Sequence, residues 1–228
     1  MQLAIDTSTE YAGLALVRDN EALAEMNWRC GLNHTVELYP HLDFLMKSAR
    51  AEMKDLDCII VALGPGSFNG LRVGVSAAKG LALNLNIPII GIGTLQATAY
   101  QHGETGLPIC AVQNAGREEI AVAIYQCKPR KGWTEIKGEY ITSPAALAET
   151  IKETTLFCGE IKPAVALKLK KLLKSKAVIP DPASQMRRAF YLAELGLKRR
   201  AAGQFDNLAI LQPVYLRRPP ITERRKPF

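Results

Sequence analysis

The chain has 228 residues, of which 48% are hydrophobic and 22% charged. This balance excludes a disordered chain, and the length suffices for one large domain or two small ones. No apolar run reaches the roughly 18 residues of a membrane-spanning helix, and no basic segment precedes the first apolar stretch, so we expect neither a membrane anchor nor a signal peptide. Five scattered cysteines without a CxxC pair predict buried thiols in a reducing cytoplasm.

The net charge of +7 is unevenly distributed along the chain. Residues 1–110 hold 7 Lys/Arg and 11 Asp/Glu, whereas residues 111–228 hold 22 and 11. The basic second half indicates one of two things: an anionic partner, with nucleic acid as the first candidate, or a solvated basic surface.

The first half shows apolar runs and helical periodicities that predict strands alternating with helices. Asp19-Asn20 is typical of a two-residue hairpin turn. Pro40 falls inside the first helical pattern, where it either kinks the helix or marks its true first turn. The expected strands are 2–7, 12–17, 22–28, 58–63 and 88–92, and the expected helices are 33–51, 69–84 and 94–101.

A second set of elements begins after a break near residues 102–106 and partly repeats the order of the first. Its expected strands are 108–113, 119–125, 133–141 and 155–158, and its expected helices are 144–153, 162–174 and 182–202. Two such halves predict an α/β protein with the two-lobed actin-like ATPase (ASKHA) fold, built from ribonuclease H-like lobes with mixed sheets. We expect an N-terminal lobe at 1–105 and a smaller C-terminal lobe at 106–228.

Polar turns follow the leading strand of each half, where an actin-like fold holds the phosphates of a nucleotide. Asp6, Thr7 and Ser8 form the first turn, and Asn114 begins the second. Magnesium at such a site requires acidic residues, but Asn114 is neutral and the acidic residues 118–119 lie beyond the turn. The sequence therefore predicts a degenerate nucleotide site with no catalytic residue, no cofactor and at most weak ATP or ADP binding.

A glycine-rich turn joins strand 58–63 to helix 69–84. Neither Gly-Lys-Ser/Thr nor a third glycine follows at the required spacing, so the turn is neither a P-loop nor a dinucleotide fingerprint. Two interpretations remain open: an anion site at a helix N-terminus, or a tight turn chosen for packing. The candidate residues of this turn are Gly64, Gly66, Ser67, Gly70 and Arg72.

A metal site is not expected. The chain has three histidines, and His34 and His41 would lie about 10.5 Å apart along a helix. Metal–nitrogen bonds near 2.1 Å do not bridge that distance.

Three segments together resemble the bacterial TsaB (YeaZ) family: 6–9, 64–74 and 213–217, of which the middle one is the most specific. The resemblance implies an actin-like fold and a cytoplasmic role in tRNA processing, the formation of threonylcarbamoyladenosine next to the anticodon. It further implies a pseudo-enzyme subunit that pairs with the catalytic paralogue TsaD, with the ATPase TsaE as a third component and tRNA reached through the complex.

The resemblance also implies self-association as a homodimer through the helices at 34–50 and 69–84. The second helix has one side made of small residues, which would permit close approach of a partner. The residues expected on this pairing surface are His34, Leu38, Leu42, Leu71, Gly74, Val75 and Ala78.

The chain departs from the family pattern at two positions. The family usually has Thr at the position of Asn69 and an Asp-Ala-Arg turn at the position of Asn114. The alternative function is an actin-like ATPase or small-molecule kinase that uses Asp6. The basic residues of the tail either contact tRNA phosphates or form a solvated end; they are Arg217, Arg218, Arg224, Arg225 and Lys226.

Overall fold

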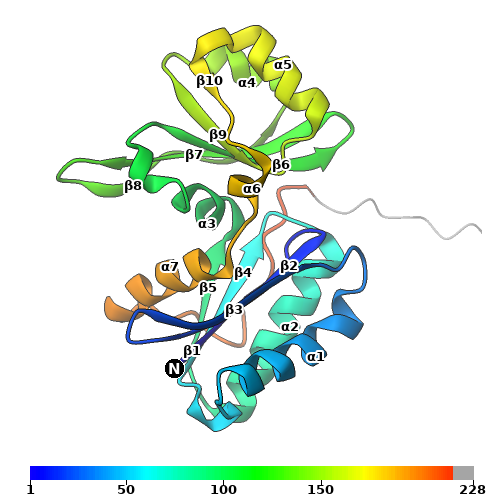
Figure 1. The fold of residues 1–228 in the computed structure, drawn as a ribbon, viewed down its shortest axis with the longest axis vertical. Helices are drawn as coiled ribbons and strands as arrows, with labels where there is room; N and C mark the ends of the chain where they lie inside the picture. The colour runs from blue at the N-terminus through cyan, green and yellow to red at the C-terminus, as the bar shows by residue number, and fades with distance from the viewer. Residues whose placement is uncertain (218–228) are drawn as a thin grey trace, which may run out of the picture.

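The computed structural model describes residues 1–217, which form two lobes (Figure 1). Each lobe holds one five-stranded mixed sheet, in the order β3-β2-β1-β4-β5 in the first lobe and β8-β7-β6-β9-β10 in the second. The two orders are equivalent, with an antiparallel three-stranded lead-in followed by parallel strands. The predicted α/β fold with two actin-like lobes and mixed sheets is therefore confirmed.

The elements of the first lobe follow the predicted order closely. The Asp19-Asn20 turn has positive φ at both residues, as a tight hairpin turn requires. The elements are β1 (Gln2–Asp6), β2 (Tyr11–Arg18), β3 (Glu21–Arg29), α1 (His34–Ser48), β4 (Cys58–Gly64), α2 (Phe68–Leu85), β5 (Ile89–Gly93) and α3 (Thr94–Tyr100).

The second lobe repeats this order with shorter helices. Ser143 caps its first helix, with Pro144 at the first helical position. Its elements are β6 (Ile109–Gly116), β7 (Glu119–Lys128), β8 (Gly132–Thr142), α4 (Pro144–Thr150), β9 (Thr155–Gly159), α5 (Pro163–Leu173) and β10 (Ala177–Val178). Two further helices follow, α6 (Pro182–Gln185) and α7 (Ala189–Ala201), and the second of them packs on the first sheet.

The first sheet is covered on both faces because its strands alternate between two apolar surfaces. Leu3 and Ile5 of β1 face the core beneath α1 and α2, whereas Ala4 faces α7. The α7 side is built from small residues: a Cβ on Gly196 would lie 2.6 Å from Ile60. Small residues allow α7 to lie close to the sheet. In the second lobe, α4 and α5 cover one face and α3 covers the other.

Two expectations on the helices are corrected. The helix expected at 182–202 is interrupted at residues 186–188, because Arg187 turns toward Asp6 instead of continuing a helix. Pro40 lies six residues after the start of α1, so it does not mark the first turn. The two-residue strand β10 was not predicted, whereas the predicted burial of the cysteines holds for all except Cys127.

The division after residue 105 separates the two sheets, but the chain returns to the first lobe after residue 186. There α7 packs on the first sheet, and residue Asp206 forms a bridge with Ile89. The basic tail residues beyond Arg217 lie outside the described residues. Within residues 1–217, no helix is long and apolar enough to cross a membrane.

Candidate functional site between the lobes

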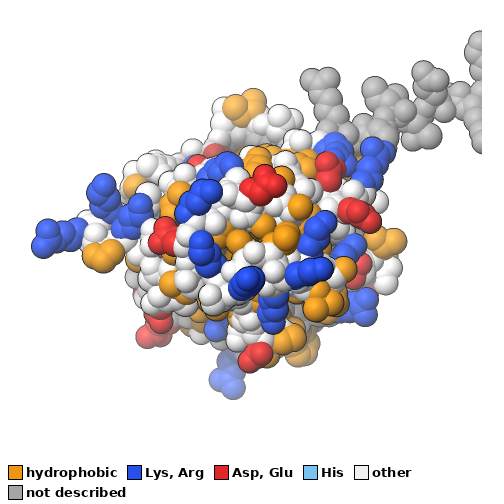
Figure 2. Space-filling view, turned by 90° about the horizontal axis from the view of Figure 1, so that it is seen from above, with side chains coloured by type: hydrophobic (Ala, Val, Ile, Leu, Met, Phe, Trp, Pro, Cys, Tyr) orange, Lys and Arg blue, Asp and Glu red, His pale blue; other side chains and the backbone are white. Residues whose placement is uncertain are grey.

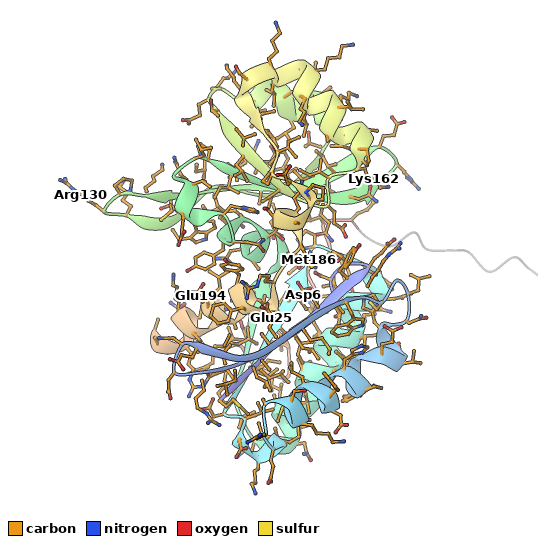
Figure 3. All side chains as sticks on the ribbon, in the orientation of Figure 1. Asp6, Glu25, Arg130, Lys162, Met186 and Glu194 are labelled. Carbon is orange, nitrogen blue, oxygen red and sulfur yellow. The ribbon has the colours of Figure 1, made fainter. Side chains whose placement is uncertain are left out.

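Asp6 ends β1 at the floor of the space between the lobes, and its side chain is 7% exposed (Figure 3). Its Oδ1 accepts hydrogen bonds from the backbone N–H of Ser8 at 2.9 Å and from the Ser8 hydroxyl at 2.5 Å. Its Oδ2 accepts a hydrogen bond from Nε of Arg187 at 2.8 Å. Both carboxylate oxygens are therefore already satisfied within the chain.

Arg187 is the functional residue that the sequence did not reveal. It lies in the break between α6 and α7, and its side chain is 13% exposed. Besides Asp6 it donates a hydrogen bond to the Thr9 hydroxyl at 3.1 Å. A guanidinium here supplies, from the chain itself, the positive charge that a magnesium ion would bring to an ATPase site. No local signal identifies it, because residues 182–202 have an ordinary helical composition.

A cleft of about 700 Å³ opens above this ion pair and is lined by both lobes. Glu160, which follows β9, faces Asp6 and Arg187 from the second lobe. Burial raises the pKa of Glu160, and the carboxylates of Glu10 and Asp6 raise it further, against the opposing effect of Arg187. The carboxylates of Asp6 and Glu160 thus lie near the Arg187 guanidinium, so its positive charge is already offset within the chain.

The second polar turn faces the same cleft but differs from the first. Asn114 is exposed, and its Oδ1 accepts a hydrogen bond from the backbone N–H of Gly116 at 3.3 Å. The neighbouring Gln113 is buried and donates through Nε2 to the Ser8 carbonyl at 3.4 Å, so it connects the two turns directly. Asn114 therefore closes its own turn and brings no charge to the site.

The glycine-rich turn packs closely against the Asp6 turn. The backbone N–H of Ser67 donates to the Ser8 carbonyl at 2.7 Å. A Cβ on Gly66 would lie 2.3 Å from that same carbonyl oxygen. The Ser67 hydroxyl caps α2 by accepting from the N–H of Gly70. Of the two interpretations, these contacts support a tight packing turn.

The small residues along one side of α2 also pack against the Asp6 turn. Thr7 donates through its hydroxyl to the Gly70 carbonyl at 2.7 Å, and a Cβ on Gly74 would lie 2.2 Å from the Thr7 hydroxyl oxygen. His34 donates through Nε2–H to the Thr9 carbonyl at 2.7 Å, since a carbonyl only accepts. The Asp6 turn is thus held by the glycine-rich turn, α1 and α2 together.

The segment 213–217 joins the same region. The N–H of Val214 donates to the Leu63 carbonyl at 2.8 Å, and the rings of Tyr215 and Phe68 lie 5.1 Å apart. Arg72 lies over the Phe68 ring at 3.9 Å from its centre. Arg217 continues to the second lobe, where it pairs with Glu119. The three sequence motifs therefore meet at the junction of the lobes.

The side chains expected on the pairing surface do not face outward. Every one of them is buried in the first lobe, because the apolar stripes of α1 and α2 face the sheet and the Asp6 turn. They are His34, Leu38, Leu42, Leu71, Gly74, Val75 and Ala78. Other residues of the same helices would have to form any contact with a partner.

Metal ligands do not gather within residues 1–217: no group of three or more His, Cys, Asp or Glu side chains is placed to hold an ion. His34 bonds Thr9, whereas His41 stacks on Trp28 with ring centres 4.2 Å apart. The two histidines therefore have separate partners.

Comparisons with known proteins agree with this arrangement. A family model described as "TsaD: tRNA N6-adenosine threonylcarbamoyltransferase" matches residues 29–210. The tRNA threonylcarbamoyladenosine biosynthesis protein TsaB of Bacillus subtilis (strain 168) is 32% identical over 219 residues, which cover 94% of this chain and 93% of that protein.

Two solved structures from Pseudomonas aeruginosa share the fold. One, an uncharacterized protein with similarity to peptidase YEAZ, has a TM-score of 0.80 at 23% identity, covering 95% of this chain and 99% of that chain. The other, YeaZ, has a TM-score of 0.77 at 22% identity, covering 93% and 99%. With the three motifs joined at one interlobe junction, the chain belongs to the TsaB (YeaZ) family of tRNA threonylcarbamoyladenosine biosynthesis proteins.

Proposed function

We propose that this chain is a non-catalytic subunit that pairs with TsaD and activates threonylcarbamoyl transfer to the tRNA adenosine next to the anticodon. The observation that carries the proposal is the buried pair of Asp6 and Arg187. In an active actin-like ATPase the equivalent carboxylate must be free to hold magnesium, directly or through water. Here both carboxylate oxygens are bonded within the chain.

The rest of the cleft supports the same conclusion. Asn114 lacks the charge needed at the second turn, and Glu160 adds a carboxylate where a nucleotide phosphate would lie. The Ser67 N–H, which an anion would need, is bonded to Ser8. We therefore propose weak ATP or ADP binding at most, no cofactor of its own, and work in the cytoplasm, where tRNA is modified.

The exposed face of α1 and α2 is the proposed pairing surface, toward TsaD in the complex and toward a second copy when the chain is alone. Exposed apolar side chains lie along it, with 69% of Val36, 59% of Phe44 and 72% of Leu83 accessible. Gly80 of α2 has open space where a Cβ would be. Exposed apolar groups of this kind mark protein contacts, and a bare glycine permits close approach. TsaE would join this pair as the third component.

The test is light scattering on this chain alone and mixed with TsaD, followed by tRNA modification with each component and with both. A 1:1 complex that modifies tRNA only when both chains are present is the expected result. Full activity of TsaD without this chain would overturn the proposal. Magnesium-dependent ATP hydrolysis by this chain alone, abolished by Asp6→Asn, would instead favour the ATPase or kinase alternative.

Two matched variants locate the surface. Val36→Glu/Phe44→Glu places two charges on the exposed face of α1, and we expect it to weaken the complex at least tenfold. Leu23→Glu/Ile136→Glu makes the same change at exposed apolar residues of β3 and β8, away from that face. Equal loss of binding in both variants would show that the surface has been wrongly assigned.

A further inference from the structure

A basic face covers the outer side of the second lobe, on and around α5. Between residues 161 and 180 the chain has six lysines and no acidic residue. All six side chains are exposed. They are Lys162, Lys168, Lys170, Lys171, Lys174 and Lys176.

These lysines are uncompensated within the described part of the chain. None of the nine ion pairs found among residues 1–217 includes one of them. Lysines of the first lobe differ, since Lys47 pairs with Asp43 and Lys54 pairs with Glu52, each at 2.7 Å. A cluster of like charges without counter-charges repels itself and attracts a polyanion.

The lysines of α5 face solvent because the opposite side of the helix buries apolar residues. Leu169 and Leu173 are buried in the core of the second lobe. Leu167 points outward with 70% of its surface exposed, and Lys170 and Lys171 follow it by one helical turn. Figure 2 looks onto this end of the molecule and shows Lys and Arg side chains, with some Asp and Glu side chains among them, around an apolar centre.

The composition of this face favours a phosphate backbone over bases or a compact acidic peptide. Flexible ammonium groups act as point charges toward phosphate. The large exposed side chains of α5 and β10 are aliphatic, namely Leu167, Leu172 and Val178. Aromatic stacking platforms, which bind unpaired bases, are absent from α5 and β10. Contacts of this kind hold RNA without reading its sequence.

We propose that the basic face binds the phosphate backbone of RNA. Within the complex of the proposed function it would hold the body of the substrate tRNA, and that part of the inference rests on the proposed function. The binding itself is a property of this chain alone, so it can be measured without TsaD. Failure of RNA binding and failure of pairing are therefore separate results.

The experiment measures binding of an unmodified tRNA transcript to the full chain alone, by fluorescence anisotropy from about 50 to 200 mM salt. The variant is Lys168→Gln/Lys170→Gln/Lys171→Gln. Losing three phosphate contacts should make the negative slope of log K against log salt less steep by about 2 to 3. It should also reduce the affinity at low salt by at least about tenfold.

The matched control is Lys128→Gln/Arg130→Gln/Lys131→Gln. These three basic residues lie at the tip of the β7–β8 hairpin in the same lobe, and Figure 3 shows Arg130 projecting from that tip. The control removes the same charge, and we expect it to retain most of the affinity. Equal losses in the two variants would mean that net charge alone drives binding and would overturn the proposal.

Two other anionic partners, a lipid surface and an acidic peptide, are tested as alternative ligands of the basic face. Vesicles containing phosphatidylserine and a polyglutamate peptide are measured with the same proteins. Binding to either one without binding to tRNA would overturn the proposal, as would tRNA binding that the α5 variant leaves unchanged. Thermal unfolding of both variants shows whether any loss comes from the fold, and single substitutions at Lys168 and Lys171 replace the triple variant if it unfolds.

Discussion

The two lobes share one strand order but differ in what their leading turns do. In the first lobe, Asp6 is buried, bonded to Ser8 and neutralised by Arg187. In the second, Asn114 is exposed and accepts a hydrogen bond from the N–H of Gly116 in its own turn. The same topology therefore yields one turn that is a packed structural centre and one that is a neutral surface loop. An ATPase of this fold would need both turns charged and open.

The exposed faces of the outer helices, α1 in the first lobe and α5 in the second, also differ in chemical character. The first lobe presents apolar side chains such as Val36 and Phe44 on α1, whereas α5 of the second presents exposed lysines that form no ion pair within residues 1–217. A duplicated fold can thus divide its surfaces, with one suited to a protein partner and the other to a polyanion. The variants below test this comparison, beginning with the largest expected effect.

Arg187→Ala should lower the free energy of unfolding by about 3–5 kcal/mol, because it leaves the Asp6 carboxylate buried without its partner. Arg188→Ala is the neighbouring control. Its pair with Glu25 is half exposed, with 51% of the arginine and 12% of the glutamate side chain accessible, so we expect a smaller loss of about 1–2 kcal/mol. Urea unfolding of both variants measures the difference. Equal losses would mean that the buried pair contributes no more to stability than the half-exposed pair.

Gly74→Leu should destabilise the first lobe by about 3 kcal/mol, because any side chain there meets the Thr7 hydroxyl. Gly80→Leu lies six residues further along α2 in open space, and we expect it to leave the melting temperature nearly unchanged. Thermal unfolding and light scattering separate fold from association. The comparison fails if Gly74→Leu keeps its melting temperature, or if Gly80→Leu pairs as well as the unchanged chain.

The ionisation of Glu139 in β8 should make the stability of the fold depend on pH. Burial raises its pKa to about 7, with a further contribution from Glu135. The folded state therefore holds a proton that the unfolded state releases near pH 4.5, so stability falls as the pH rises from about 4.5 to 7. With allowance for the partial exposure of this side chain, we expect its ionisation to lower the free energy of unfolding by about 2 kcal/mol between these pH values. Glu139→Gln should abolish that change.

The control for this pH dependence is Glu149→Gln, at an exposed position of α4. Denaturant unfolding at a series of pH values compares the two variants. A pH profile that Glu139→Gln leaves unchanged would contradict the assignment of this carboxylate.

Arg217→Ala should have the smallest effect, a loss below about 1 kcal/mol that shrinks further in high salt. Its pair with Glu119 joins the lobes, but both side chains are well exposed, at 40% and 38%. The backbone bond from Val214 to Leu63 holds the same segment independently. A loss above about 2 kcal/mol would show that the ion pair, not the backbone bond, fastens the segment.

Much of the fold could be predicted because its signals are local. Apolar runs and turn residues placed every strand of the two sheets except β10, as at Cys58–Gly64 and at the Asp19-Asn20 turn. The charge difference between the Asp6 and Asn114 turns was also visible in the sequence. The orientation of α2 was not, because a stripe of small residues fits a partner helix as well as the chain's own Thr7.

The amino-acid sequence by itself determined the order of the elements, the duplicated fold and the weakness of the second turn. Only the tertiary structure decided that Asp6 is neutralised, because its partner Arg187 lies 181 residues away, in a stretch whose local pattern predicted unbroken helix. Hydrophobic periodicity is a local signal that extends over a few residues of the sequence. A buried ion pair instead joins residues that the folded chain brings within about 3 Å of each other, however far apart they lie in the sequence. Arg187 lies where the last helix is interrupted, at residues 186–188, and from there its side chain reaches Asp6.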